Sequence, residues 1–305
     1  MPTTLWLLVV RFLCFEFSHF ANSKFSNSLS NSHVAMPQTI SLIGIPWDEQ
    51  SSFAKGCAAG PSAIRRALHC ESSNTFCEAG FDIAAHPLIQ DTGDLVLGSG
   101  EAARLTIEQA VREALQSRHK VLALGGDHAV TWPILRAYAE FYPKLNVLHL
   151  DAHPDLYDEL DGNRYSHACP FARALEEGLI TRLVQVGIRT MNRHQQNQVQ
   201  RFGVETIAMN QLDSGVPTSF DGPVYLSLDL DVLDPAFAPG VSHHEPGGMT
   251  TRELISIIQK LGPHLVGADI VELNPEKDLQ AVTAMTAAKL VKEVLARLLI
   301  HESHP

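Results

Sequence analysis

Several features that mark common protein classes are missing from this 305-residue sequence. None of its five cysteines is spaced as a CxxC pair, which argues against a zinc ribbon or a disulfide framework. It has no block of Lys and Arg, and its formal net charge is −11, so we expect no nucleic-acid partner and no membrane partner. An apolar run at residues 5–15 is interrupted by Arg11 and is shorter than the roughly 20 residues of a spanning helix. The sequence therefore indicates a cytoplasmic globular protein with reduced thiols.

The N-terminal segment, residues 1–35, differs in composition from the rest of the chain. It is rich in Ser and Asn and lacks the basic start and cleavage site of a secretory signal. An organelle transit peptide would fit the Ser content, but Arg11 and Lys24 are its only cations. We favour translation from Met36, because a strand pattern begins directly after it. Residues 1–35 are then a disordered or non-native extension, and residues 36–305 form a single domain.

From Thr39 onward, short apolar runs rich in β-branched residues alternate with segments of helical spacing, without linkers or repeats. Thr250 and Glu253 form a capping-box pattern ahead of one apolar helix. Continuous apolar strands separated by helices indicate an α/β fold with a mostly parallel sheet, covered on both faces. The predicted strands are 39–45, 120–124, 145–150, 182–187, 223–230 and 265–271, and the predicted helices include 61–70, 101–117 and 282–300.

Three of the predicted strands end in acidic residues and histidines, and ligands bind outside the carboxyl ends of strands in such sheets. In the segment after residue 150, strand alternation would place Asp151, His153 and Asp155 on one side. Burying unpaired charges costs several kcal/mol each, so a role for all these acids in an apolar core is excluded. The sequence therefore predicts a metal site with the candidate ligands His128, Asp151, His153, Asp155, Asp229 and Asp231.

The chemistry of this ligand set indicates which metal it would hold. Four carboxylates and two imidazoles offer mostly hard oxygen donors and no thiolate, which suits manganese better than a structural zinc. Four aspartate charges balance two divalent ions, and paired metals about 3.5–4 Å apart generate hydroxide near neutral pH. We therefore expect two Mn²⁺ ions in each subunit.

Three motifs in the sequence, GGDHAV (125–130), DAHPD (151–155) and SLDLDVLDPAFAPG (227–240), resemble the signature blocks of the arginase/agmatinase (ureohydrolase) family. The resemblance extends over residues 39–300. It implies a three-layer α/β/α sandwich, assembly into homotrimers or homohexamers, and a small cationic guanidino substrate. It also implies one manganese held by His128, Asp151, Asp155 and Asp229, and a second held by His153, Asp151, Asp229 and Asp231.

The same resemblance implies catalytic roles for Asp155, His167 and Glu272. Glu272 would bind the substrate guanidinium, since a carboxylate pairs bidentately with that planar group. Asp155 would orient the water that the two metals activate for attack on the guanidinium carbon. His167 would contact the substrate or carry a proton to the departing amine, yielding urea and a primary amine. From the residues alone, Glu272 could also be a salt-bridge partner and His167 a loop histidine.

The substrate is less clearly indicated than the reaction. Arginases bind the substrate α-amino group through acidic residues just after the strand that here ends at Arg189. Residues 190–194 of this sequence contain no acidic residue. This favours agmatine, cleaved to putrescine and urea, with Asn192 as a candidate substrate-binding residue. The alternative is L-arginine, because residues 161–178 and 241–248 look like plant-type arginases.

Three further alternatives remain open. A guanidino acid such as 4-guanidinobutyrate could pair with Arg193. A single-zinc, deacetylase-like amidohydrolase would need counterparts of Asp151, His153 and Asp229 but not the complete second set of ligands. A non-catalytic member of the family is the third alternative. Such a protein would not need every metal ligand, whereas this sequence keeps all of the predicted ones.

Overall fold

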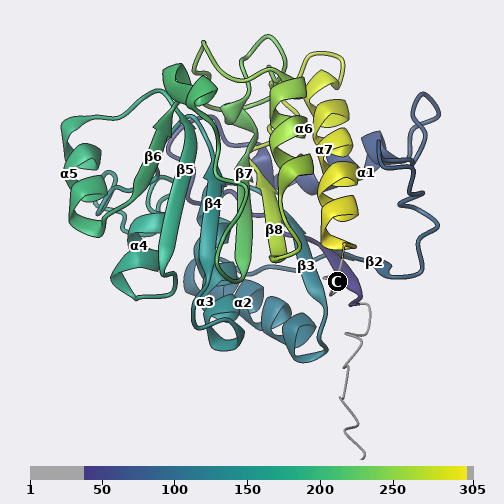
Figure 1. Ribbon diagram of the computed structural model, residues 1–305, viewed down its shortest axis with the longest axis horizontal. Coiled ribbons are helices and arrows are strands. Elements are labelled where there is room, and N and C mark those ends of the chain that lie inside the picture. Colours follow the sequence, from purple (N-terminus) through teal and green to yellow (C-terminus); the bar gives the residue numbers. More distant parts are fainter. Residues whose placement is uncertain (1–37, 301–305) are drawn as a thin grey trace, which may run out of the picture. The chain divides into compact units, whose positions relative to one another are not determined.

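The computed structural model describes residues 38–300, which fall within one compact unit, Ala35–Pro305. An eight-stranded sheet of order β2-β1-β3-β8-β7-β4-β5-β6 crosses this unit, and all its neighbouring strands are parallel (Figure 1). The expectation of a mostly parallel α/β sheet is confirmed. The strands are β1 (Ile40–Gly44), β2 (Ile89–Asp94), β3 (Lys120–Leu124), β4 (Asn146–Leu150), β5 (Arg182–Ile188), β6 (Glu205–Ala208), β7 (Val224–Asp229) and β8 (Leu265–Val271).

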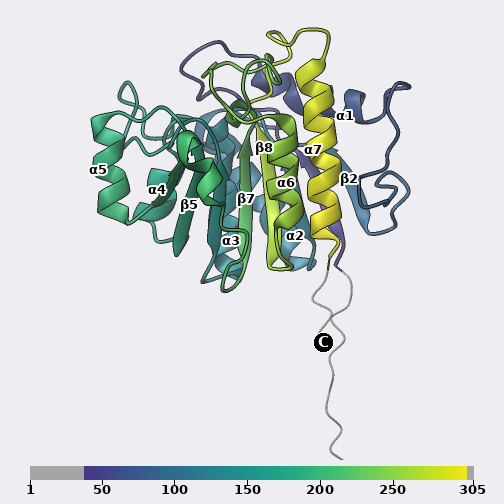
Figure 2. The ribbon, with the colours of Figure 1, turned by 45° about the horizontal axis from the view of Figure 1, so that its top comes forward.

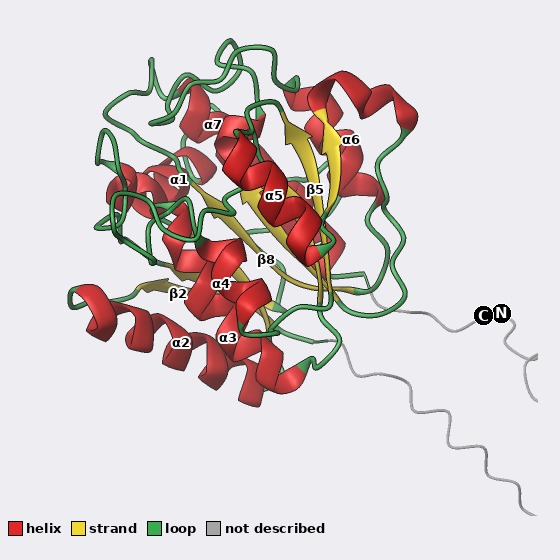
Figure 3. Ribbon diagram, turned by 90° about the vertical axis from the view of Figure 1, so that its left-hand side faces the viewer, coloured by secondary structure: helices red, strands yellow, loops and turns green. Residues whose placement is uncertain are grey.

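Helices cover both faces of the sheet. Figure 2 shows α6 and α7 in front of the strands with α2 and α3 behind them, and Figure 3 shows α2, α3 and α4 together on one side. α1 packs against α7 on the same face as α6. The helices are α1 (Gly60–Leu68), α2 (Gly100–Gln116), α3 (Thr131–Phe141), α4 (Pro170–Glu176), α5 (Arg193–Phe202), α6 (Thr251–Lys260) and α7 (Val282–Leu298).

The sheet separates two apolar cores because successive side chains of a strand point to opposite faces. In β3, Leu122 and Leu124 join the core under α1, α6 and α7. Val121 and Ala123 join the core under α2, α3 and α4. All four side chains are fully buried, which explains why the central strands read as continuous apolar runs.

The six predicted strands are present, each within about two residues of its expected bounds, but β2 and β6 were not predicted. These two are the edge strands of the sheet. β2 has the sequence IQDTGD and is mostly exposed, and every residue of β6 is at least partly exposed. Edge strands need no apolar run, so the pattern that identified the central strands does not find them.

The helix signals read from the sequence have counterparts in the structure. Thr250 caps α6 through a complete capping box, in which its hydroxyl accepts from the backbone N–H of Glu253 and the Glu253 carboxylate accepts from the backbone N–H of Thr250. Pro61 lies in the first turn of α1, where its missing N–H is not needed. Among residues 38–300, no helix is both long and apolar enough to cross a membrane. The extension expected over 1–35 lies outside the described residues.

Candidate active site

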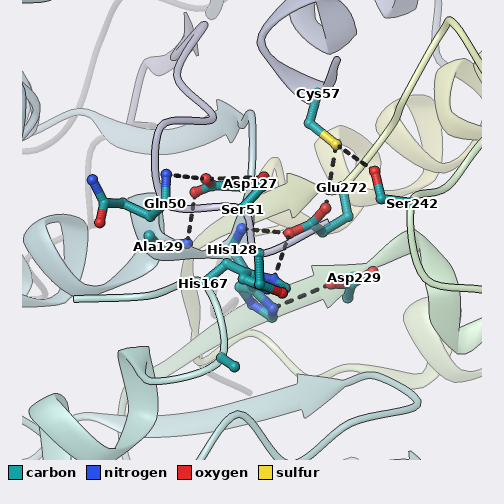
Figure 4. Close-up of polar contacts among 12 residues, drawn as sticks. Gln50, Ser51, Cys57, Asp127, His128, Ala129, His167, Asp229, Ser242 and Glu272 are labelled. Atoms are coloured by element: carbon teal, nitrogen blue, oxygen red, sulfur yellow. Dashed lines mark hydrogen bonds and ion pairs between the residues drawn. The ribbon is translucent and has the colours of Figure 1, made fainter. Parts of the chain in front are cut away.

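The site lies at the carboxyl ends of four adjacent strands, β3, β8, β7 and β4, in the middle of the sheet. His128 follows β3 and Glu272 follows β8 directly. Asp229 is the last residue of β7, and Asp151 comes directly after β4. Parallel strands end at the same edge of a sheet, so residues that are far apart in sequence meet here. Figure 4 shows part of this cluster.

His128 is fully buried among three carboxylates. Its Nδ1 lies 3.0 Å from Oδ2 of Asp155 and 3.2 Å from Oδ2 of both Asp151 and Asp229. Despite these distances, Nδ1 forms no hydrogen bond of acceptable geometry. A buried nitrogen that faces three carboxylate oxygens without bonding to them fits a cation held between the four groups. These are the four residues expected around the first metal.

The opposite nitrogen of His128 has a defined partner. Nε2 lies 3.0 Å from the hydroxyl of Ser227, which donates at 2.8 Å to Oδ1 of Asp269. Oδ2 of Asp269 accepts from the hydroxyls of Thr131 and Tyr225, both at 2.9 Å. Because the Ser227 proton points to Asp269, the hydroxyl accepts from Nε2–H of His128. In the neutral imidazole this leaves Nδ1 as the unprotonated nitrogen, which is the form that binds a metal.

The second group of candidate ligands surrounds His153. Its Nδ1 lies 2.8 Å from Oδ2 of Asp231 and 3.4 Å from Oδ1 of Asp151. The backbone N–H of Asp231 donates to Oδ1 of Asp229 at 2.8 Å. The carboxylate of Asp229 therefore lies next to the residues around His153 as well as those around His128. Asp151 and Asp229 thus lie between His128 on one side and the pair of His153 and Asp231 on the other. This is the arrangement expected of ligands that bridge two metals.

The carboxylates of this cluster oppose one another's ionisation. Burial, followed by the charges of Asp231 and Asp151, raises the pKa of Asp229 well above its usual value. Burial and the charge of Asp151 also raise the pKa of Asp231 to about 6. Cations are what would keep all the carboxylates ionised at neutral pH, which supports a metal centre over a structural cluster.

The backbone around the ligands differs from the extended segment that we expected. β4 ends at Leu150, and Asp155 has a φ of 50°, so strand alternation does not run from Asp151 to Asp155. That part of the prediction is wrong, although the side chains do converge. Glu272 has a φ of 66°. Such left-handed conformations are costly for residues other than glycine and are found where a site requires them.

His149 belongs to the site but was not predicted as part of it. Its Nδ1 accepts from Nε2 of Gln185 at 3.0 Å, and its Nε2 therefore donates to Oδ2 of Asp151 at 2.7 Å. The imidazole orients Asp151 from behind. The signal was present in the sequence, because a histidine inside a fully buried strand requires a polar partner.

Glu272 and His167 form a buried pair beside the metal ligands (Figure 4). Oε1 of Glu272 accepts from the backbone N–H of His128 at 2.9 Å and lies 3.4 Å from Nδ1 of His167. Although burial opposes both charged forms, this contact lowers the pKa of Glu272 to about 2 and raises that of His167 to about 9. Across residues 38–300, no Lys or Arg forms a salt bridge with Glu272. Its carboxylate is therefore available to a cationic ligand.

Two further residues, Asp127 and His243, shape the surroundings of His167. Asp127 is fully buried and holds the preceding loop through Gln50 N–H, at 2.9 Å, and the hydroxyl of Ser51, at 3.2 Å. The ring of His243 stacks on His167 with centroids 4.9 Å apart. Neither Asp127 nor His243 was predicted as a site residue, because only the fold brings their segments to His167.

Asn192 has a well-defined structural role. Its side chain accepts from the backbone N–H of Gln195 and so caps α5, and its Nδ2 donates to the hydroxyl of Tyr157 at 2.7 Å. Both polar atoms of its amide are used within the protein. Its role as a substrate contact stays a prediction.

The chain is similar to known ureohydrolases over most of its length. It is 40% identical over 293 residues to the arginase of Medicago truncatula, covering 90% of this chain and 87% of the relative. It is 38% identical over 271 residues to the agmatinase of Blochmanniella floridana, covering 83% and 86%. Its structure is similar to that of Medicago truncatula arginase with a TM-score of 0.81 and 40% identity, covering 86% and 88%.

The expected cytoplasmic location is wrong. The Medicago truncatula relative is named a mitochondrial arginase, and two arginases of Arabidopsis thaliana are named mitochondrial and chloroplastic/mitochondrial. The expectation rested on scattered cysteines, and the four described ones are indeed free thiols. Free thiols indicate a reducing compartment, but that compartment need not be the cytosol.

The model of the arginase family matches residues 38–296, nearly the whole described chain. Candidate ligand groups that meet at the ends of four central strands, and a buried carboxylate without a Lys or Arg partner beside them, agree with that match. The chain therefore belongs to the arginase family, and it is a hydrolase of guanidino C–N bonds with the binuclear metal-binding site of that family.

Proposed function

We propose that this protein is an arginase, which hydrolyses L-arginine to L-ornithine and urea with two Mn²⁺ ions. The observation that carries the proposal is the buried carboxylate of Glu272, without a Lys or Arg partner among the described residues and next to His128. A planar guanidinium supplies the paired N–H donors that such a carboxylate accepts. The names of the plant relatives, 37–41% identical to this chain, favour arginine over agmatine. This reverses the order of substrates expected from the loop after β5.

The chain's own residues have distinct tasks in this reaction. Glu272 orients the guanidinium, and its pKa of about 2 keeps it ionised throughout the working pH range. His167 has a pKa of about 9 beside Glu272, so it holds a proton at neutral pH that it can transfer to the departing amine. Asp155, brought into the cluster by its left-handed backbone, accepts a hydrogen bond from the attacking water.

Manganese is the metal that the donor set favours. His128, Asp151, Asp155 and Asp229 would hold one ion, and His153 and Asp231 would complete the set for the second together with the two shared aspartates. Oxygen donors outnumber nitrogen donors, and none of the six side chains is a thiolate, which favours Mn²⁺ over a structural Zn²⁺. When bound, the ions lower the pKa of a water molecule, so that it reacts near neutral pH.

The substrate's ammonium group needs a carboxylate that the loop 190–194 does not supply. The segment after β7 passes beside this loop, because the backbone carbonyl of Glu245 accepts from Nε of Arg189 at 2.8 Å. Two residues earlier, His243 stacks on His167. Glu245 is partly exposed, and its carboxylate forms no hydrogen bond or salt bridge within the described residues. We propose that Glu245 binds the ammonium group of the substrate.

Agmatine is the second candidate, and the similarity to the agmatinase of Blochmanniella floridana, 38% identical over 271 residues, is the observation that favours it. The two are separated by urea release from the manganese-loaded protein with L-arginine, agmatine, 4-guanidinobutyrate and guanidine, measured side by side. We expect the highest kcat/KM for L-arginine. A higher kcat/KM for agmatine would overturn the substrate but not the reaction, and no urea from any compound would overturn both.

We further propose that the protein acts in mitochondria or plastids and assembles as a homotrimer or homohexamer. The location rests on the names of the plant relatives and on the Ser-rich, acid-poor composition of residues 1–35. A fusion of residues 1–35 to a fluorescent protein should enter one of these organelles, and a diffuse cytosolic signal would contradict the proposal. Light scattering should give three or six times the chain mass of 33.4 kDa.

A further inference from the structure

A cysteine that is not among the predicted site residues touches the carboxylate of Glu272. Sγ of Cys57 donates to Oε2 of Glu272 at 3.2 Å, and the two residues are 215 positions apart (Figure 4). Cys57 is fully buried, in a short 3-10 helix over Cys57–Ala59 that precedes α1. The contact therefore links the start of the first helix to the residue that follows β8.

The surroundings of Cys57 direct its proton to Glu272. Its other polar neighbour is the hydroxyl of Ser242, 3.6 Å away. That hydroxyl donates to the carbonyl of Ala54 at 2.8 Å and accepts from Nδ2 of Asn274 at 3.0 Å. Because the Ser242 proton is used for Ala54, Ser242 does not donate to the thiol, and the charged oxygen of Glu272 is the nearer acceptor for the S–H, at 3.2 Å against 3.6 Å. Burial and the charge of Glu272 raise the pKa of the thiol, so it stays protonated and remains a donor.

The backbone that carries Cys57 is held in place. The carboxylate of Asp48 accepts from the N–H groups of Gly56 and Ala58, at 2.7 and 3.2 Å, on both sides of the cysteine. Gly56 has a φ of 145°, and a Cβ there would lie 2.3 Å from Oδ1 of Asn274. A thiol that is fixed on this turn can impose an orientation on Glu272 instead of following it.

The contact with Cys57 leaves acceptor capacity on the carboxylate of Glu272. Each oxygen of a carboxylate can accept two hydrogen bonds. Oε1 of Glu272 uses one for the N–H of His128, and Oε2 uses one for Cys57. One lone pair remains on Oε2, and the second lone pair of Oε1 faces Nδ1 of His167 at 3.4 Å. The two parallel N–H groups of a guanidinium would take these two positions. Without the thiol, only contacts to Oε1 remain, and the carboxylate can turn toward His167, 3.4 Å from that oxygen.

We propose that Cys57 is a positioning residue for substrate binding, whose thiol fixes the plane of the Glu272 carboxylate for bidentate contact with the guanidinium. The inference rests on the proposed function, because it assigns Glu272 to the guanidinium. It predicts that a donor at position 57, and not merely a side chain of suitable volume, supports substrate affinity.

The test compares two pairs of variants in the full-length, manganese-loaded enzyme. Cys57→Ala and Cys57→Val have no donor, whereas Cys57→Ser and Cys57→Thr have a hydroxyl, and Thr and Val are nearly equal in volume. We expect KM to rise by about tenfold or more in the variants without a donor, with kcat within about twofold, as for a lost hydrogen bond to a charged group. The Ki of guanidinium ion as a competitive inhibitor should rise by the same factor. Ser and Thr should keep the wild-type values.

Equal KM values in Cys57→Ser and Cys57→Ala would overturn the proposal, since the thiol would then only fill space. If Cys57→Val fails to fold, the Ser and Ala pair still decides. Cys70→Ala is the matched control, because Cys70 is partly exposed and contacts Ser72 and Met285 instead of the site. Failure of the proposed function would look different, because wild-type enzyme would then release no urea, or Glu272→Gln would leave turnover intact.

Discussion

The hydroxyl of Ser227 lies 3.0 Å from Nε2 of His128 and connects this buried imidazole to the carboxylate of Asp269. The contact fixes the tautomer of His128 whose Nδ1 faces the three aspartates. Metal ligands depend on such partners, because a ring that can rotate or exchange its proton binds the ion less tightly.

Replacing Ser227 by Ala should therefore weaken metal binding by about 10- to 100-fold, the range typical of partners behind a metal ligand. The affinity for Mn²⁺ is measured by titrating the metal-free protein and following heat or bound metal. Ser256→Ala is the control, since Ser256 is a partly exposed serine that donates to the backbone carbonyl of Arg252 within α6. An unchanged Mn²⁺ affinity in Ser227→Ala would show that His128 needs no orienting partner.

The shared position of Asp229 leads to a prediction about both metals. Its Oδ2 lies 3.2 Å from Nδ1 of His128, while Oδ1 accepts from the backbone of Asp231. Asp229→Asn keeps an acceptor for that N–H but removes the charge. We expect the metal content to fall below two ions per chain and urea release to fall by more than about a hundredfold. Glu159→Gln, at an exposed acid, should leave both unchanged, and a variant with two metals and full turnover would contradict the assignment of Asp229.

That the six candidate ligand residues lie together could be predicted because they follow buried central strands, where any acid or histidine stands out. β2 and β6 could not, since the edges of the sheet impose no apolar pattern. The same reasoning overlooked His149, whose place inside β4 gave a signal that was not used.

Contacts between segments that are distant in sequence could not be predicted. The thiol of Cys57 meets Glu272 only because the fold brings the start of α1 to the end of β8. The backbone of Asp155 was also unpredictable, because a left-handed conformation at a non-glycine residue is imposed by its surroundings and not by local propensity.

Lys120 gives the protein a pH-dependent stability that is independent of the active site. Its Nζ is buried and donates to the carbonyl of Leu298 at 2.9 Å, and burial lowers its pKa from 10.5 to about 8. Between these two values the unfolded chain binds more protons than the folded one, so the stability due to Lys120 rises with pH. Below pH 8 both states are protonated, and the cost of burying the charge is constant.

We therefore expect the melting temperature of wild type, relative to Lys120→Met, to rise between pH 8 and pH 10.5. The difference in unfolding free energy across this window should approach about 3 kcal/mol, since one pKa unit corresponds to about 1.4 kcal/mol. Thermal unfolding followed by circular dichroism in the same buffers measures it. Lys144→Met, at an exposed lysine, should show no such trend, and parallel curves for wild type and Lys120→Met would mean that Lys120 titrates normally.

We expect Glu245 to determine the affinity for the ammonium group at the far end of the substrate from the guanidinium. The backbone of this residue is fixed by Arg189, whose Nε and Nη2 both donate to its carbonyl, at 2.8 and 2.6 Å. The residue is partly exposed, so its pairing with an ammonium group is partly screened by solvent. We expect Glu245→Gln to raise KM for L-arginine and agmatine by about fivefold at low ionic strength, with less effect in added salt.

A substrate without an ammonium group provides the discriminating comparison. Methylguanidine reaches Glu272 but has no charge to offer Glu245, so its KM should be the same in wild type and Glu245→Gln. Glu113→Gln, on the exposed side of α2, is the matched control for the change in net charge. An equal rise in KM for methylguanidine would indicate that the substitution disturbs Arg189 or His243 and not ammonium binding. No change for L-arginine would mean that its α-amino group is bound by another part of the site.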